Sequence, residues 1–309
     1  MRNAIVSYKQ LGDVLLLEPL SRLLAARAGG EPTAMLVRPA FAPLIELMPK
    51  AEMPTQAWEK YNLLLATHEG TKAWKRALFS RAHQKRLLLS QKVYQKWWHR
   101  LAFGEITYRY IDGAYWARYF WEALAKTGEP EFSPPRLQTP AADWLPKDLP
   151  ERYLVCHPTA AWSSKYWTVR GWQLLLKELE RTFSLPLVLT AGAAAEELAF
   201  CRTLQEALPF PVQNLAGSLS LSAYLATLSR AQAILAIDGS AAHLADAFSV
   251  PAFKLFGNTS ESEWHWPNPR SQVVTTGEGP PLKRPPAKDL QADKVLQAAQ
   301  EWAQLVVGS

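Results

Sequence analysis

Short apolar runs alternate with stretches of helical periodicity along almost the whole chain, and this alternation most restricts the possible folds. It is typical of α/β proteins, in which a helix links each strand of a parallel sheet to the next. A chain of 309 residues also exceeds what a single core usually supports. The sequence therefore predicts an α/β protein with parallel sheets, divided into two domains of similar size.

A proline-rich stretch separates the two halves of the chain. Between Ser133 and Pro150 there are five prolines, a density that interrupts both helices and strands and suits a connector between domains. We therefore expect one domain over residues 1–145 and a second over 146–309. The second domain would end in a helix over 289–307, which has apolar side chains available for docking.

Apolar runs and helical spacing locate the individual elements. In the first half, strands are expected at residues 4–8, 34–37 and 61–66, with a helix over 14–26. Helices of the second half are expected to begin after Thr168 and Ser220, whose side chains suit the N-cap position. The strands expected there cover residues 153–156, 186–190, 233–237 and 252–256.

Positive charge is concentrated in one segment. The chain has a formal net charge of +6, but residues 71–110 hold ten Lys or Arg against one acid, Glu105. A local field of this size attracts a polyanion or an anionic membrane surface. Within the segment, cations mix with aromatic side chains, which suits an anionic bilayer or a phosphorylated lipid. The candidates for an acceptor or membrane surface are Lys92, Lys96, Trp97, Trp98 and Arg100.

Two other interpretations of this basic segment remain open. It fits a solvated basic helix whose aromatic side chains lie in the core. Nucleic acid would use the same charges, but the sequence has no recognisable nucleic-acid-binding motif to favour it. We therefore expect no nucleic acid among the partners.

Cysteine content and hydropathy indicate a cytoplasmic protein. No apolar run reaches the eighteen or so residues that cross a bilayer, and the first six residues resemble a strand rather than a signal peptide. The two cysteines, Cys156 and Cys201, form no CxxC pair, so both are expected to be reduced thiols in or near the core.

The stretch ILAIDGSAAHLADAF, residues 234–248, places polar residues directly after a buried strand. Ligands of open parallel sheets bind beyond the carboxyl ends of the strands, where helix N-termini present free N–H groups. Gly239 and the amides after it could hold a phosphate, and Asp238 could accept hydrogen bonds from sugar hydroxyls. Alternatively, Asp238 caps the helix and His243 is a packed helix residue.

Three more junctions have the same character. Gly12 and Asp13 follow the first strand, and a carboxylate there could act as a general base or as an N-cap. In HPTAAWSSKYWTVRGW, a strand leads into a loop with Lys165, whose compact charge suits a diphosphate. The polar residues of that loop are Thr159, Ser163 and Ser164. In LFGNTSE, residues 255–261, Gly257 and Thr259 follow another strand.

Several catalytic motifs are absent from the sequence. There is no GxGxxG, P-loop, HExxH or GxSxG motif, and no DxD pair for a nucleotide-bound metal. These absences disfavour dinucleotide redox chemistry and P-loop phosphotransfer.

The junctions, in this order, resemble those of glycosyltransferase family 9, the ADP-heptose:lipopolysaccharide heptosyltransferases. The longest match is LAGSLSLSAYLATLSRAQAILAIDGSAAHLADAF, residues 215–248. The resemblance implies a GT-B fold, in which two Rossmann-like domains with parallel sheets face a central cleft. It also implies inverting transfer without a metal or another cofactor, an N-terminal acceptor domain and a C-terminal domain that binds the nucleotide sugar.

The resemblance assigns a role to each matching residue. Asp13 is similar to the family's general base, and Lys165, in Lys165-Tyr166-Trp167, to the clamp on the leaving diphosphate. Asp238 matches the acid that holds the sugar hydroxyls, and the backbone of Gly239, Ser240 and Ala241 matches the phosphate site. Glu196 matches the ribose ligand and Leu219 the nucleobase contact. Further donor-site candidates are Gly12, Thr159, Ser164, His243, Gly257 and Thr259.

The chain departs from the family pattern at two places. Ala160 and Ala161 replace adjacent threonines, and the order Asp238-Gly239-Ser240 replaces Asp-Thr/Ser-Gly. The expected activity is transfer of heptose from ADP-heptose to the lipopolysaccharide inner core, or to lipid A, at the cytoplasmic face of the inner membrane. The alternatives are a transferase or epimerase that uses another nucleotide sugar, and a non-catalytic glycolipid-binding protein.

Overall fold

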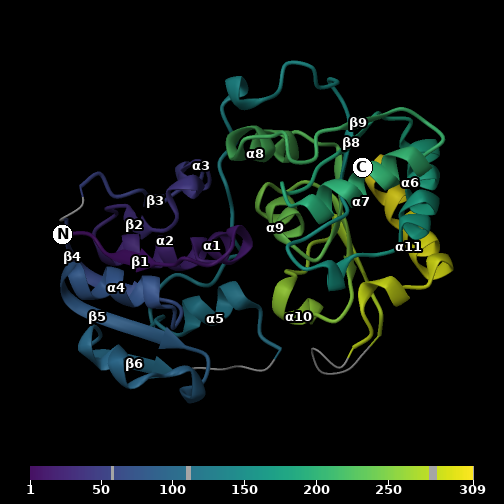
Figure 1. Ribbon diagram of the computed structural model, residues 1–309. Coiled ribbons are helices and arrows are strands. Elements are labelled where there is room, and N and C mark those ends of the chain that lie inside the picture. The colour runs from purple at the N-terminus through teal and green to yellow at the C-terminus, as the bar shows by residue number, and fades with distance from the viewer. Residues whose placement is uncertain (57–58, 109–112, 278–283, 309) are drawn as a thin grey trace. The chain divides into compact units, whose positions relative to one another are not determined.

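The computed structural model describes residues 1–56, 59–108, 113–277 and 284–308 (Figure 1). Contacts within the chain divide it into two units, Met1–Gln138 and Thr139–Ser309. Each unit contains one six-stranded sheet, and every described strand pair in both sheets is parallel. The predicted α/β class with parallel sheets is confirmed.

The first unit is built on the strand order β3-β2-β1-β4-β5-β6. Its strands are β1 (Ala4–Val6), β2 (Thr33–Leu36), β3 (Ala51–Glu52), β4 (Lys60–Ala66), β5 (Arg81–Leu89) and β6 (Glu105–Tyr108). Its helices are α1 (Leu11–Leu15), α2 (Glu18–Arg27), α3 (Ala42–Glu46), α4 (Thr71–Phe79) and α5 (Trp116–Glu122).

One helix predicted in this unit is in fact two. The expected helix over residues 14–26 is divided between α1 and α2, with Leu16 and Leu17 between them. Pro19 explains the division, because proline has no backbone N–H and is accommodated only in the first turn of a helix. A new helix therefore begins at Glu18.

The second unit has the strand order β12-β11-β10-β7-β8-β9. Its strands are β7 (Leu154–His157), β8 (Leu187–Leu189), β9 (Val212–Asn214), β10 (Ala233–Ile237), β11 (Ala252–Phe256) and β12 (Ser271–Thr275). Its helices are α6 (Val169–Phe183), α7 (Ala195–Ala207), α8 (Leu221–Ser229), α9 (Ser240–Ala247), α10 (Glu261–Trp264) and α11 (Ala292–Val307).

The four strands predicted in this unit correspond to β7, β8, β10 and β11, whereas the edge strands β9 and β12 were not predicted. Thr168 and Ser220 cap α6 and α8 through their side chains, as expected. The terminal helix α11 packs beside α6 (Figure 1). Their apolar faces share one core with the sheet, and Trp167, Trp172 and Trp302 are its largest members. Cys156 and Cys201 are both buried and free, as predicted.

Both sheets reverse their strand order at a corresponding place. β1 lies between β2 and β4, and β7 lies between β8 and β10. The chain therefore builds outward from the first strand of each unit in one direction and then in the other. Loops at such a switch point diverge beyond the carboxyl ends of the strands and leave room for a ligand. The loops after β1 and β4, and those after β7 and β10, are thus where a site is expected.

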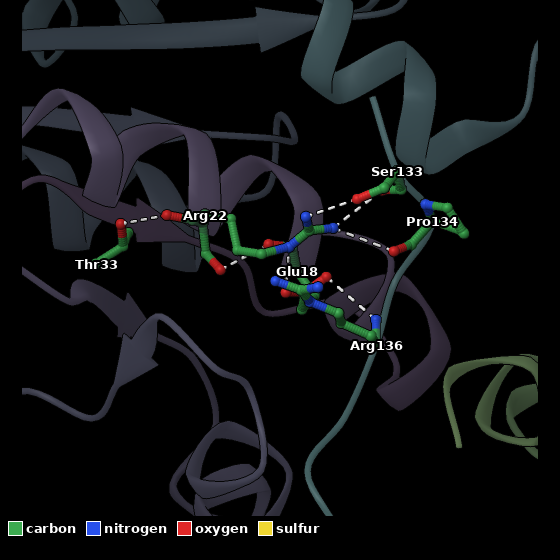
Figure 2. A network of polar contacts seen from close by, with 7 residues as sticks. Glu18, Arg22, Thr33, Ser133, Pro134 and Arg136 are labelled. Carbon is green, nitrogen blue, oxygen red and sulfur yellow. Dashed lines mark hydrogen bonds and ion pairs between the residues drawn. The ribbon is translucent and has the colours of Figure 1, made fainter. Parts of the chain in front are cut away.

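A buried polar network fastens the end of the first unit to its second helix. The Glu18 side chain is fully buried and accepts hydrogen bonds from Arg22 Nε at 2.7 Å and from the Arg136 amide at 3.2 Å. Arg22 also donates to the Ser133 hydroxyl and to the carbonyls of Ser133 and Pro134 (Figure 2). Part of the proline-rich connector is therefore held against α2.

No helix in the described part of the chain is long and apolar enough to span a membrane.

Candidate functional site

The switch point of the second sheet brings three loops together around Asp238. This residue follows β10 and is 2% exposed. Its Oδ2 accepts a hydrogen bond from Lys165 Nζ at 2.5 Å, in the loop after β7, and one from Thr259 Oγ1 at 2.6 Å, in the loop after β11. Three of the residues selected from the sequence therefore meet at one carboxylate oxygen.

Asp238 does not cap the helix that follows it. The N-cap of α9 is Gly239, and Asp238 uses its carboxylate on Lys165 and Thr259 instead. The capping interpretation is therefore wrong for this residue. An acid with 3% side-chain exposure against a lysine with 15% forms a largely buried ion pair. Such pairs are costly to desolvate, so their placement at a ligand edge favours a functional role over a stabilising one.

Lys165 retains capacity for a second anionic partner. An ammonium group has three N–H donors, and Asp238 takes one of them. The same Nζ lies 5.3 Å from the ring centroid of Trp162, an exposed side chain in the same loop. Lys165 is therefore positioned by a carboxylate and an aromatic face, and can meet a phosphate without leaving them. Ser164 is exposed beside it.

Gly239 has room for a side chain. Its φ of 175° is extended backbone that any residue adopts, and an added Cβ would meet only ordinary contacts, the nearest being Ala160 Cβ at 3.5 Å. Neither strain nor packing within the unit requires glycine here. Close approach of a ligand to the backbone would require a glycine at this position. Gly257 differs, because an added Cβ would lie 2.3 Å from the Ala287 amide nitrogen, so packing alone accounts for that glycine.

A second acid, Glu197 of α7, lies at the same switch point of the second sheet. Glu197 Oε2 accepts hydrogen bonds from Thr159 Oγ1 at 2.8 Å and from the Gly192 amide at 3.0 Å. Thr159 is fully buried, whereas Glu196, the residue selected from the sequence, is exposed. Glu197 was not among the predicted site residues. A signal for it in the sequence was the pair of adjacent acids that follows Gly192 by about one helical turn.

A neutral hydrogen-bonded group lies beneath the same edge. His157 Nδ1 is 3.0 Å from Thr190 Oγ1 and 3.4 Å from the Tyr224 hydroxyl, which also bonds the Ser240 side chain. Burial lowers the pKa of His157 to about 4 and raises that of Tyr224. Both groups are uncharged at neutral pH, so they position the loops around them without adding charge.

The remaining residues of this unit that were predicted for the sugar-donor site are packed or partly exposed. His243 is 6% exposed on α9, with its ring centroid 6.0 Å from that of Trp264, and burial lowers its pKa to about 4. These observations agree with the packed-helix interpretation. Ala241 is buried in the same helix, and Leu219 is half-buried after a turn.

Asp13 lies at the switch point of the first sheet, together with Gly12. Both are in α1, which follows β1, and Asp13 Oδ2 accepts a hydrogen bond from the Gln10 amide at 3.2 Å. The N-cap of α1 is Gln10, so the N-cap interpretation is wrong for Asp13, which is instead the N3 residue of the capping box. In the loop after β4, burial and the nearby Lys9 charge lower the pKa of His68 to about 4.

The exposed face of α4 forms a cationic pocket that the sequence analysis did not single out. Its volume is about 360 Å³, and the lining residues are Tyr8, Lys72, Lys75, Arg76 and Phe79. Tyr8 lies just after β1. Lys75 and Arg76 are adjacent, and each lies three or four residues from Lys72 and Phe79, which places all four on one side of a helix. That spacing was a signal in the sequence.

The structure separates the five residues expected at an acceptor or membrane surface. Lys92, Lys96, Trp97 and Arg100 are exposed, with Trp97 at 78%. Trp98 instead packs edge-on against Trp74, whose Nε1 donates to the Trp98 carbonyl at 2.8 Å. The segment consists of two 3₁₀ turns, Lys92–Tyr94 and Trp97–Leu101, rather than the helix of the alternative interpretation.

Within the described ranges, no group of three or more His, Cys, Asp or Glu side chains could hold a metal ion.

Comparison with known families and proteins places the chain among glycosyltransferases. The model of the family described as "Glycosyltransferase family 9 (heptosyltransferase)" matches residues 122–289, which is more than half of the chain. Lipopolysaccharide heptosyltransferase 3 of Escherichia coli is 29% identical over 120 residues, which are 38% of this chain and 35% of that protein. The match thus spans about a third of that curated relative.

Solved structures match over nearly the whole chain. A family 9 glycosyltransferase from Veillonella parvula has a TM-score of 0.79 at 15% identity, covering 100% of this chain and 98% of that one. E. coli ADP-heptose lipopolysaccharide heptosyltransferase II has a TM-score of 0.77 at 18% identity, with 99% of each chain covered. E. coli heptosyltransferase WaaC with ADP has a TM-score of 0.73 at 20% identity, covering 97% and 99%. These likenesses show the GT-B fold.

Proposed function

Because the chain belongs to glycosyltransferase family 9, we propose that it transfers heptose from ADP-heptose to the inner core of lipopolysaccharide. The observation that carries this proposal is the meeting of Lys165, Asp238 and Thr259 at the switch point of the second sheet. One carboxylate suits sugar hydroxyls, and one ammonium group suits a diphosphate. The relatives named for this reaction support the choice of donor.

In this proposal the second unit holds the nucleotide sugar. Asp238 accepts hydrogen bonds from the sugar, while Lys165 and the amides of residues 239–241 take up charge on the departing ADP. Preorganised donors directed at developing charge are usually the largest catalytic contribution. Thr159 and Ser164 would contact phosphate, Glu196 the ribose and Leu219 the adenine. Glu197 would keep the loops after β7 and β8 together through Thr159 and Gly192.

The first unit supplies the base and receives the acceptor. Asp13 would remove the proton of the attacking hydroxyl, which approaches the anomeric carbon from the face opposite ADP, so that the configuration inverts without a metal ion. The cationic pocket on α4 would receive an acidic group of the acceptor, because three cations line it. Since such an acceptor is a lipid, the protein would work at the cytoplasmic face of the inner membrane.

The proposal is tested with the purified full chain, ADP-heptose and lipopolysaccharide that lacks inner-core heptose. We expect ADP release together with an acceptor heavier by one heptose in mass spectrometry. In thermal-shift assays, ADP-heptose should stabilise the protein more than UDP- or GDP-sugars do, because a ligand of the folded state stabilises by mass action. Preference for another nucleotide sugar, or acceptor binding without donor consumption, would overturn the assignment.

Two lysine variants of the second unit test whether the proposed site itself binds the donor. Lys165→Ala should remove the stabilisation by ADP-heptose and weaken transfer. Lys177→Ala changes an exposed lysine of α6 and should change neither. Equal responses of the two variants to ADP-heptose would place the diphosphate elsewhere.

A further inference from the structure

Exposed apolar side chains are concentrated in one part of the molecule. Among the described residues, six of the ten large apolar side chains that are exposed lie between Phe79 and Tyr108. Single exposed apolar residues are normal on protein surfaces, but a concentration of them marks an interaction site. The same part of the chain holds the basic segment, so the surface combines apolar and cationic side chains.

Three of these apolar residues each follow a cation. Lys92-Val93, Lys96-Trp97 and Arg100-Leu101 repeat at intervals of four residues, and all six side chains are exposed. We call residues 92–101 the doublet segment. The apolar member is 69% exposed in the first doublet, 78% in the second and 63% in the third. The segment contains no acidic residue.

The doublet segment is held in place from beneath. His99 is fully buried, its Nδ1 lies 3.1 Å from the Lys96 amide, and its Nε2 lies 3.1 Å from the Glu69 carbonyl oxygen. Burial lowers the pKa of His99, so the ring stays neutral. Next to it, Trp98 packs against Trp74 of α4. Exposure of the three doublets is therefore a feature of an anchored segment, not of a chain that lacks contacts.

We propose that the doublet segment inserts Val93, Trp97 and Leu101 into the interfacial region of an anionic bilayer, while Lys92, Lys96 and Arg100 contact lipid phosphates. Lipid favours this combination, because apolar side chains enter the headgroup boundary and cations beside them meet anionic headgroups. Nucleic acid fits less well, since aliphatic Val93 and Leu101 cannot stack on bases. The inference specifies how the proposed enzyme meets the membrane, but lipid binding does not require the transfer reaction.

The test is co-sedimentation of the full chain with vesicles of phosphatidylcholine alone or with one quarter phosphatidylglycerol. The wild type should bind the anionic vesicles more strongly. Val93→Ser/Trp97→Ser/Leu101→Ser should lower the partition coefficient roughly tenfold or more, and Lys92→Gln/Lys96→Gln/Arg100→Gln should abolish the preference for anionic lipid. Circular dichroism and thermal unfolding verify that the variants fold.

Matched controls come from the second unit. Trp162→Ser removes another exposed tryptophan, which lies near Lys165, and Lys177→Gln/Arg202→Gln/Lys294→Gln removes one exposed cation from each of α6, α7 and α11. Both controls should bind vesicles as the wild type does. If the controls lose binding as strongly as the doublet variants, general charge and surface polarity explain the effect and the proposal fails.

Insertion is measured separately with brominated lipids, which quench tryptophan fluorescence by contact. Trp97→Phe should retain binding but lose part of the quenching, whereas Trp162→Phe should lose none. Unchanged quenching in Trp97→Phe would overturn insertion. The proposal is also overturned if the apolar variant changes only the oligomeric state in analytical ultracentrifugation, or only RNA binding, with vesicle binding intact. If the wild-type protein binds vesicles but transfers no heptose, the proposed function fails and the lipid-binding proposal stands.

Discussion

At the switch point of the first sheet, Tyr8 and three cations of α4 line a pocket, and Asp13 lies on the helix after β1. At the corresponding point of the second sheet, a buried acid is paired with a lysine and a threonine. The strand order of the two sheets is the same. Topology determines where a ligand can bind, while the charge balance of the loops determines which ligand suits each place. In our proposal these ligands are an acidic group in the first unit and a sugar joined to a diphosphate in the second.

The largest effect should come from Asp13→Asn. This variant tests whether the carboxyl edge of the first sheet, here called the first edge, takes part in the reaction as well as in binding; the corresponding edge of the second sheet is the second edge. We expect transfer to fall by about 10²–10⁴, the usual contribution of a general base. The affinity for ADP should stay unchanged, because the proposal assigns the nucleotide contacts to the second unit. An amide oxygen can still accept the hydrogen bond from the Gln10 amide, so the helix start is preserved. Turnover numbers and ADP dissociation constants provide the measurement.

The control for this variant is Asp143→Asn, which changes an exposed acid in the second unit. It should leave both quantities unchanged. Near-normal turnover of Asp13→Asn would exclude Asp13 as the base and reduce the first edge to a binding surface.

The second prediction concerns the ion pair of the second edge. Lys165→Ala leaves Asp238 buried without its cation, and breaking such a pair costs about 3–5 kcal/mol. Since the Lys165 side chain retains 15% exposure, water replaces part of the interaction and we expect a loss of about 3 kcal/mol. Thermal and urea unfolding measure it. Lys165→Met/Asp238→Asn should recover part of the loss, and a single variant as stable as the wild type would contradict a buried pair.

The third prediction addresses the cationic pocket of the first edge. Lys72→Gln/Lys75→Gln removes two of its three cations, both on the exposed side of α4. The KM for an acidic acceptor should rise by roughly tenfold, with less effect at high salt, because screened surface charges attract weakly. The ADP affinity should not change. Lys177→Gln/Lys294→Gln is the matched control, and an equal rise in KM there would show that net charge, not the pocket, is responsible.

The predictability of these two edges from the sequence differed for a physical reason. Strands β10 and β11 are buried along their whole length, so they stand out as apolar runs. Strand β5 was not foreseen, because its first half alternates Arg81, His83, Lys85 and Arg86 with few apolar residues and is mostly exposed. The helix break before Pro19 was also missed, although proline in a first turn was a signal for it.

Individual side chains were harder to place than elements. The sequence places adjacent acids at 196 and 197, but only the rotation of α7 decides which of them turns toward Gly192. In the same way, Trp97 and Trp98 are equivalent in composition, and the 3₁₀ turn exposes one and packs the other against Trp74. Such choices depend on tertiary packing, which a pattern of residue types does not contain.

The smallest effect should come from a substitution of Glu18, the fully buried acid of the first unit. This substitution tests whether Glu18 has a structural role, in contrast to the ligand-binding role proposed for Asp238. Burial raises the pKa of Glu18 above its ordinary value of 4.5, outweighing the opposing effect of Arg22. A raised pKa in the folded protein means that the folded state binds the proton more tightly than the unfolded state does. The stability that Glu18 contributes is therefore greatest below about pH 4.5 and declines as the pH rises through its folded pKa.

Glu18→Gln removes this titration while retaining an oxygen that can accept from Arg22 or from the Arg136 amide (Figure 2). The free energy of unfolding of the wild type, relative to the variant, should decrease as the pH rises from about 4.5 toward 7. Unfolding in urea at a series of pH values measures the difference, and Glu46→Gln, at the end of α3, serves as a control with an exposed acid. A difference that grows with pH would mean that the Arg22 ion pair, not burial, dominates this site, and that the first unit also stabilises a charged acid.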